Sequence, residues 1–168
     1  MHDLNKVGAA AQVQEGIDRY HAQAKNMSFD DFTNEKHSSR RLGRNMTKAG
    51  DPRPHPRCDA HAIVSGGHYL AMQIRAILAW CEKRIDNSIN GAWLPRGEAD
   101  KPHMPPYLRN AAAHNRIHRN DYYRWMNLKI NPTSIQSKED LERELKIVKW
   151  KLQSGTIPSH ITPKLPKA

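Results

Sequence analysis

The sequence lacks several features that would place it in a familiar class of protein. Among its 168 residues there is no uninterrupted apolar run of the roughly 18 residues that a membrane-spanning helix needs, so we expect no membrane partner. The first residues, Met1-His2-Asp3-Leu4-Asn5-Lys6, do not follow the basic-then-apolar order of a secretory signal. We therefore expect any export to depend on another segment or on a separate machine.

Cysteine is also scarce. The two cysteines, Cys58 and Cys81, are too few for a disulfide framework, and they lack the C-x-x-C spacing of a zinc clip. Cys81 is in phase with the apolar residues of a helical pattern. We expect both to be ordinary buried or half-buried thiols.

Acidic residues are outnumbered by basic ones. Asp and Glu total 17 against 27 Lys and Arg, which gives a formal net charge of +10 and a sequence pI near 9.8. Taken by itself, such a charge favours an anionic partner of any kind: a nucleic acid, an anionic membrane or an acidic protein. A hydrophobic fraction of 38% and a mean hydropathy of −0.84 indicate a core that is small relative to the surface.

The N-terminal part has the pattern of helices followed by a basic linker. Apolar residues at three- and four-residue steps predict an amphipathic helix over 8–26 (Val13, Ile17, Tyr20, Ala24), and Ser28 can cap a short helix that runs to Phe32. Three prolines between 52 and 56 exclude regular helix there. We predict a helical lobe with a basic linker over 1–50 and a functional core over 51–168, with a C-terminal helix and a proline-rich tail.

The core has the pattern of short strands set among helices. The expected elements are a strand at 60–64, a helix at 68–84, a tight turn at Asn90-Gly91, a strand at 93–95, a loop at 96–106, and helices at 111–118 and 122–128. Ser137-Lys138-Glu139-Asp140 resembles a capping box that begins a last helix, which Gly155 closes. The fold class is therefore α+β and mostly helical, with Tyr122, Tyr123 and Trp125 better suited to core packing than to stacking on bases.

Three histidines have the spacing of metal ligands. His114 and His118 are four residues apart, so on a helix they project from one face, and His61 on a strand can supply a third nitrogen. Imidazoles suit zinc and nickel, whereas magnesium prefers oxygen ligands. Three protein ligands leave room for water and a phosphate oxygen, as a catalytic ion requires. In the alternative, a purely structural zinc site, His68 or Asp59 would close the tetrahedron.

The order of these parts resembles the AHH nucleases, a branch of the HNH/endonuclease VII group with the ββα-metal fold. Proteins of this kind occur mainly as toxin domains in bacterial competition. The resemblance spans 60 to about 130 and rests on Ala60-His61-x-Ile63-Val64, Arg75-x-x-Leu78, Ile85-Asp86, Asn90-Gly91-x-Trp93-Leu94-Pro95, His114-x-x-Ile117-His118 and Tyr122-Tyr123.

The resemblance implies a role for each matching residue. His61, His114 and His118 are expected to hold one divalent ion (Zn, Ni or Mg), and Asn90 is expected to fix the loop beside the catalytic histidine. The family motif has a second histidine directly after the first, which acts as the general base, but this chain has Ala62 there. We therefore expect an endonuclease that is inactive in this form, and the substitution is either an engineered His→Ala change or a natural variation.

The expected substrate is DNA cut with little sequence preference, with RNA less favoured. Five arginines are candidate contacts to the nucleic-acid backbone: Arg40, Arg41, Arg44, Arg116 and Arg119. A nucleic-acid-binding module without catalysis is the alternative function, and an RNase with the same site is another.

If the toxin reading holds, the producing cell needs an inhibitor. An acidic immunity protein is the expected partner, because a basic cleft attracts a negatively charged surface. We expect the domain to be delivered as part of a larger effector without its own signal peptide, and to act in the cytoplasm of the target cell.

Overall fold

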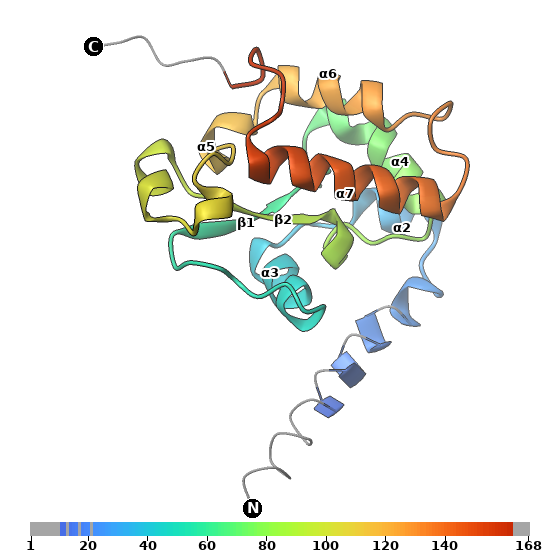
Figure 1. The fold of residues 1–168 in the computed structure, drawn as a ribbon. Helices are drawn as coiled ribbons and strands as arrows, with labels where there is room; N and C mark the ends of the chain where they lie inside the picture. The colour runs from blue at the N-terminus through green and yellow to red at the C-terminus, as the bar shows by residue number, and fades with distance from the viewer. Residues whose placement is uncertain (1–10, 13, 17, 21, 163–168) are drawn as a thin grey trace, which may run out of the picture.

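The fold is that of a computed structural model, which describes residues 11–162 except 13, 17 and 21 (Figure 1). It is a mostly helical α+β fold, as predicted. The elements are α2 Phe29–Asn34, α3 Ser39–Lys48, β1 Cys58–Ala62, α4 Met72–Trp80, β2 Gly91–Pro95, α5 His114–Ile117, α6 Asn120–Lys129 and α7 Lys138–Ser154, with short 3₁₀ turns between them. The described residues from 11 to 24 are helical, while Val13 and Ile17 of the predicted stripe lie outside the described residues.

The two strands form an antiparallel pair at the centre of the molecule. Ala62 lies opposite Gly91, and His61 lies opposite Ala92. Helix α3 packs against β1 and helix α7 packs against β2, so the small sheet lies between helices (Figure 1). The buried stripe of α7 is the one that the sequence predicts: Leu141, Leu145, Val148 and Leu152.

Helix α3 belongs to the same core as the strands. Its Leu42 and Met46 are fully buried in the main apolar cluster together with residues of β1, β2 and α7. The division predicted after residue 50 therefore does not coincide with an edge of the packed core. Sequence composition alone suggested a separate lobe because the outer face of α3 is basic.

The Asn90-Gly91 pair is not the tight turn that its sequence predicts. Asn90 ends a 3₁₀ turn, Ser88–Asn90, and Gly91 has extended backbone angles of φ −114° and ψ 142° at the start of β2. Glycine is favoured here by space instead, since a Cβ atom at 91 would clash with Sδ of Met46.

Several other helix and strand boundaries differ from the predicted ones. The strand predicted at 60–64 is Cys58–Ala62, and the helix predicted at 68–84 ends at Trp80, just before Glu82 takes a left-handed φ of 55°. The helix predicted at 111–118 is a single turn.

Other predictions are confirmed. Ser137 Oγ accepts a hydrogen bond from the backbone N–H of Asp140 at 3.1 Å, and Gly155 ends α7 with a left-handed φ of 73°. Both cysteines are free and buried, and Tyr122, Tyr123 and Trp125 are core residues.

Within the described residues, no helix has the length and apolar character needed to cross a bilayer.

Candidate metal centre

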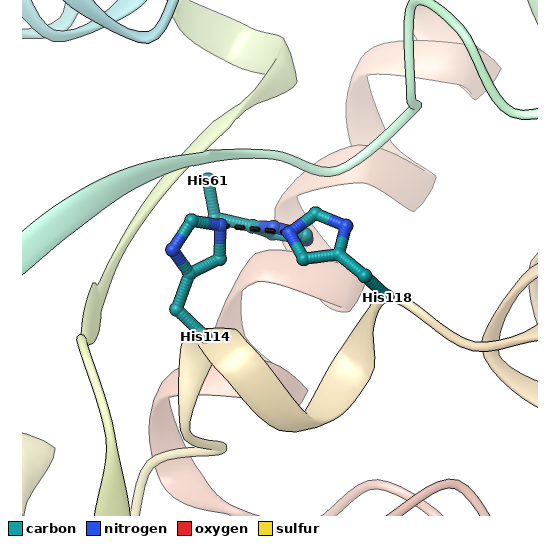
Figure 2. A group of neighbouring side chains, drawn as sticks. All are labelled: His61, His114 and His118. Carbon is teal, nitrogen blue, oxygen red and sulfur yellow. Dashed lines mark hydrogen bonds between the residues drawn. The ribbon is translucent and has the colours of Figure 1, made fainter.

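The three predicted histidines converge at one place. His61 projects from β1, His114 is the first residue of α5, and His118 is the residue that follows α5 (Figure 2). One possible ligand atom from each lies within 4.8 Å of the others. Among the described His, Cys, Asp and Glu residues, no other side chain joins this group.

The one-turn helix α5 brings two of the imidazoles into contact. Nε2 of His114 lies 2.8 Å from Nε2 of His118, and the ring centroids are 4.7 Å apart (Figure 2). Two nitrogen lone pairs at this distance repel one another unless a proton or a cation lies between them. The two nitrogens can therefore share one hydrogen in a neutral hydrogen bond, or a cation that takes its place.

The tautomer of His61 follows from its surroundings. Its Nε2 lies 3.4 Å from the hydroxyl of Tyr122, and that hydroxyl donates its own hydrogen to the carbonyl of Ile63 at 2.9 Å. The hydroxyl can then only accept from His61, so Nε2 carries the hydrogen and Nδ1 keeps a lone pair.

Nδ1 of His61 is the strongest sign that an ion fits. The residue is fully buried, and this nitrogen has no hydrogen-bond partner. An unpartnered buried polar atom is costly, and a metal ion at this nitrogen would remove that cost. The residues present therefore fit a divalent cation bound by His61, His114 and His118.

The other two rings are held in the same way as that of His61. Nδ1 of His114 faces Oδ2 of Asp59 at 3.3 Å, and Nδ1 of His118 faces the hydroxyl of Tyr123 at 3.3 Å. Oxygen partners of this kind fix the orientation of histidine ligands and keep the second nitrogen available. The sequence did not reveal these three supports, because the partners lie on other elements or were assigned to the core.

Burial favours the neutral form of His61 and of His118. It lowers the pKa of His61 well below the ordinary histidine value, and His114, His118 and His37 lower that pKa further. Burial also lowers the pKa of His118, helped by the neighbouring His114, His37 and His68. Neutral imidazole is the form that binds a metal ion.

Asn90 is fully buried and joins two loops. Its Oδ1 accepts from the backbone N–H of Val64 at 2.8 Å, and its Nδ2 donates to the carbonyls of Val64 (3.1 Å) and Ile85 (2.8 Å). These bonds fix the segment that follows His61, and the catalytic role expected of Asn90 stays a prediction.

Ala62 lies beside the centre and contributes only a methyl group. It follows His61 directly in β1, so its side chain points to the other face of the strand, where it is 6% exposed within the apolar core. A methyl group cannot accept a proton, so no general base is present at this position.

Neither candidate for a fourth ligand closes the site. Asp59 contacts the outer nitrogen of His114 and also accepts from Arg96 Nε at 3.3 Å. The ring of His68 stacks on Tyr123 at a centroid distance of 3.9 Å, and its Nδ1 accepts from the N–H of Leu70. Within the described chain, the group keeps three protein ligands, and His118 is on the exposed side.

The five predicted arginines have different surroundings. Arg40 and Arg44 are exposed and line a cleft that reaches His114. Arg116 lies on α5 and the exposed Arg119 directly follows His118, so both flank the proposed ligands.

Arg41 does not fit the prediction of a backbone contact. Its Nε donates to the buried carboxylate of Asp86 at 2.6 Å, and its NH2 lies 3.3 Å from Glu35. Both carboxylates belong to the fold, so this guanidinium is paired within the protein and is not available to a nucleic-acid backbone.

A comparison with known families identifies the family of the chain. Residues 42–153 match AHH, described as a nuclease family of the HNH/ENDO VII superfamily with conserved AHH. The matched range contains the three histidines, Ala62 and Asn90. No curated protein and no solved structure matches the chain.

Proposed function

The chain belongs to the AHH family of nucleases, and from this premise we propose that it is a metal-dependent endonuclease that hydrolyses DNA with little sequence preference. The observation that carries the proposal is the convergence of His61, His114 and His118, with one buried, unpartnered nitrogen on His61. Three neutral nitrogen ligands suit zinc or nickel better than magnesium.

A bound divalent ion would supply Lewis-acid stabilisation of the charge that develops on the phosphate. The residues of the chain hold that site in place. Asp59, Tyr122 and Tyr123 orient the three rings, and Asn90 fixes the segment after β1. Arg116 and Arg119 flank the ligands along the chain, and in this proposal they would attract phosphates near the cleaved bond.

Hydrolysis also needs a proton acceptor. Water attacks phosphorus as it loses a proton to a base, and the bond from phosphorus to the departing 3′ oxygen breaks. The family motif places this base at the position of Ala62, where a methyl group cannot accept the proton. Loss of a general base costs about 10²–10⁴-fold in rate, so this form is a weak or inactive nuclease.

The biological role that agrees with this chemistry is a toxin of bacterial competition. A basic nuclease is harmful to the cell that makes it, so an acidic immunity protein is the partner that its charge of +10 favours. Delivery within a larger effector into the cytoplasm of the target cell is part of the same proposal.

The test restores the base. Ala62→His is assayed on supercoiled plasmid with Zn²⁺, Ni²⁺ or Mg²⁺ in turn, beside the parent chain and the double variant Ala62→His/His114→Ala. We expect nicking by Ala62→His alone, and none after chelation. The nuclease proposal fails if Ala62→His folds and binds metal yet cuts neither plasmid nor a matched RNA. Cleavage of RNA alone would reassign the substrate.

A further inference from the structure

A cleft of about 760 Å³ lies between α3 and the strand pair and reaches the metal centre. One wall is the outer face of α3, with Arg40, Arg44 and Lys48. The other side includes Asp59, Trp93 and the ligand His114. The cleft therefore connects a row of cations with the proposed site of cleavage.

The three cations form one row. Arg40, Arg44 and Lys48 are spaced at i, i+4 and i+8, so they project from the same face of α3. None of them has an ion pair with the described residues, and α3 itself contains no acidic residue. Arg41, on another face of the same helix, is paired with Asp86 and Glu35.

Such a row opposes the formation of its own helix, because like charges at i, i+4 repel one another. The core does not need these side chains, since the buried residues of α3 are Leu42, Gly43 and Met46. A row of unpaired cations in a concave surface has the charge and shape to receive a chain of anions.

The opposite wall offers little to compete with a bound anion. Among the described residues, Asp59 is the one carboxylate that lines the cleft, and it is engaged by His114 and Arg96 at 3.3 Å each. Trp93 is 5% exposed, and its Nε1 donates to the carbonyl of Asp51 at 2.9 Å. This ring is therefore part of the floor and does not offer a free face for stacking on a base.

We propose that this cleft binds the sugar–phosphate backbone of the substrate and leads one strand to His114 and His118, an inference that rests on the nuclease function proposed above. From Arg40 to Lys48 the helix rises about 12 Å. At about 3.4 Å of helix axis per nucleotide of one B-DNA strand, the row spans three to four nucleotide steps. Contacts of this kind position the strand without reading its sequence, which accounts for cleavage without sequence preference.

The test measures the salt dependence of binding, with the metal chelated so that nothing is cut. The parent chain and the variant Arg40→Gln/Arg44→Gln/Lys48→Gln are titrated against a labelled 20-base-pair DNA of mixed sequence at several salt concentrations. The matched control is Lys129→Gln/Lys146→Gln/Lys151→Gln, which removes the same charge from α6 and α7.

The slope of the logarithm of the binding constant against the logarithm of the salt concentration is negative. If each cation contacts one phosphate, the magnitude of this slope is smaller by about 2.7 in the cleft variant, because each neutralised phosphate contributes about 0.9. The control keeps the parent slope, and an unrelated DNA sequence gives the same result. A duplex RNA of equal length, titrated in the same way, tests whether the cleft binds an RNA backbone as well as a DNA backbone.

Three results would overturn the inference. In the first, the cleft variant keeps the parent slope. In the second, the slope of the control changes as much as that of the cleft variant. In the third, a polyglutamate peptide displaces the DNA charge for charge, which would assign the cleft to an acidic protein. The measurement is independent of catalysis. If the cleft variant shows a reduced salt dependence but Ala62→His cuts nothing, the nuclease proposal is rejected and the backbone-binding cleft is kept. If Ala62→His cuts DNA but the cleft variant keeps the parent salt dependence, the nuclease proposal is kept and the cleft proposal is rejected.

Discussion

His37 and Asp86, 49 positions apart in the sequence, are joined by a contact of 2.5 Å between Nδ1 and Oδ1. The carboxylate is fully buried and also accepts from Arg41 Nε at 2.6 Å and from the N–H of Ser38 at 2.9 Å. One carboxylate therefore fixes the start of α3 to the loop that precedes Asn90. This link holds the wall of the basic cleft in position relative to the metal centre.

Asp86→Asn should destabilise the protein strongly. The substitution keeps the shape but removes the charge that compensates Arg41, and breaking a buried ion pair typically costs about 3–5 kcal/mol. Urea denaturation measures the change. Asp121→Asn is the control, because Asp121 pairs with Arg124 on the surface and should change stability little. Equal stability of the two variants would contradict the anchoring role.

Tyr122→Phe should weaken metal binding and leave the fold in place. The hydroxyl fixes the hydrogen of His61 on Nε2, and loss of such a support typically lowers metal affinity about 10–100-fold. Calorimetric titration with Zn²⁺ or Ni²⁺ gives the affinity. Tyr107→Phe removes an exposed hydroxyl as the control. Unchanged affinity in Tyr122→Phe would show that the ion, if bound, does not depend on this tautomer.

The stability of the metal-free protein should fall as the pH drops below the ordinary histidine pKa of about 6.5. The pKa of His61 is lowered in the folded state, mainly by burial. Below pH 6.5 the unfolded chain therefore binds a proton at His61 that the folded chain does not bind. Stability is retained above pH 6.5 and declines from there down to the lowered pKa.

Urea denaturation between pH 7.5 and pH 5 tests this for the parent chain and for His61→Asn, which cannot titrate. A shallower dependence on pH in His61→Asn is the expected result. Identical pH profiles would mean that His61 is not the group responsible.

Gly91→Ala should destabilise the junction of β2 and α3. The added Cβ would clash with Sδ of Met46, and overpacking of this kind typically costs about 1–3 kcal/mol. Gly67→Ala is the control, because a Cβ there meets nothing within 4 Å. The double variant Gly91→Ala/Met46→Ala should show a coupling between the two sites. Tolerance of Gly91→Ala alone would indicate that Met46 can move aside.

The sequence by itself determined the features that depend on neighbouring residues. His114 and His118 share one face because a single helical turn separates them, and the last helix begins at its serine cap and ends at its glycine for equally local reasons. The mostly helical α+β class and the nuclease family followed from the order of such local signals. His61 lies beside His114 and His118, as predicted from the order of the strand and the helix in the sequence.

Only the tertiary structure decided which distant groups meet. Asp59 supports His114 across 55 positions and Tyr122 supports His61 across 61, and neither pairing leaves a periodic trace in the sequence. The same holds for the arginines of α3. Arg40 and Arg41 are adjacent and chemically identical, yet one lines the cleft and the other neutralises Asp86. Successive residues on a helix point in directions about 100° apart, so the packing of that helix assigns each side chain its partner.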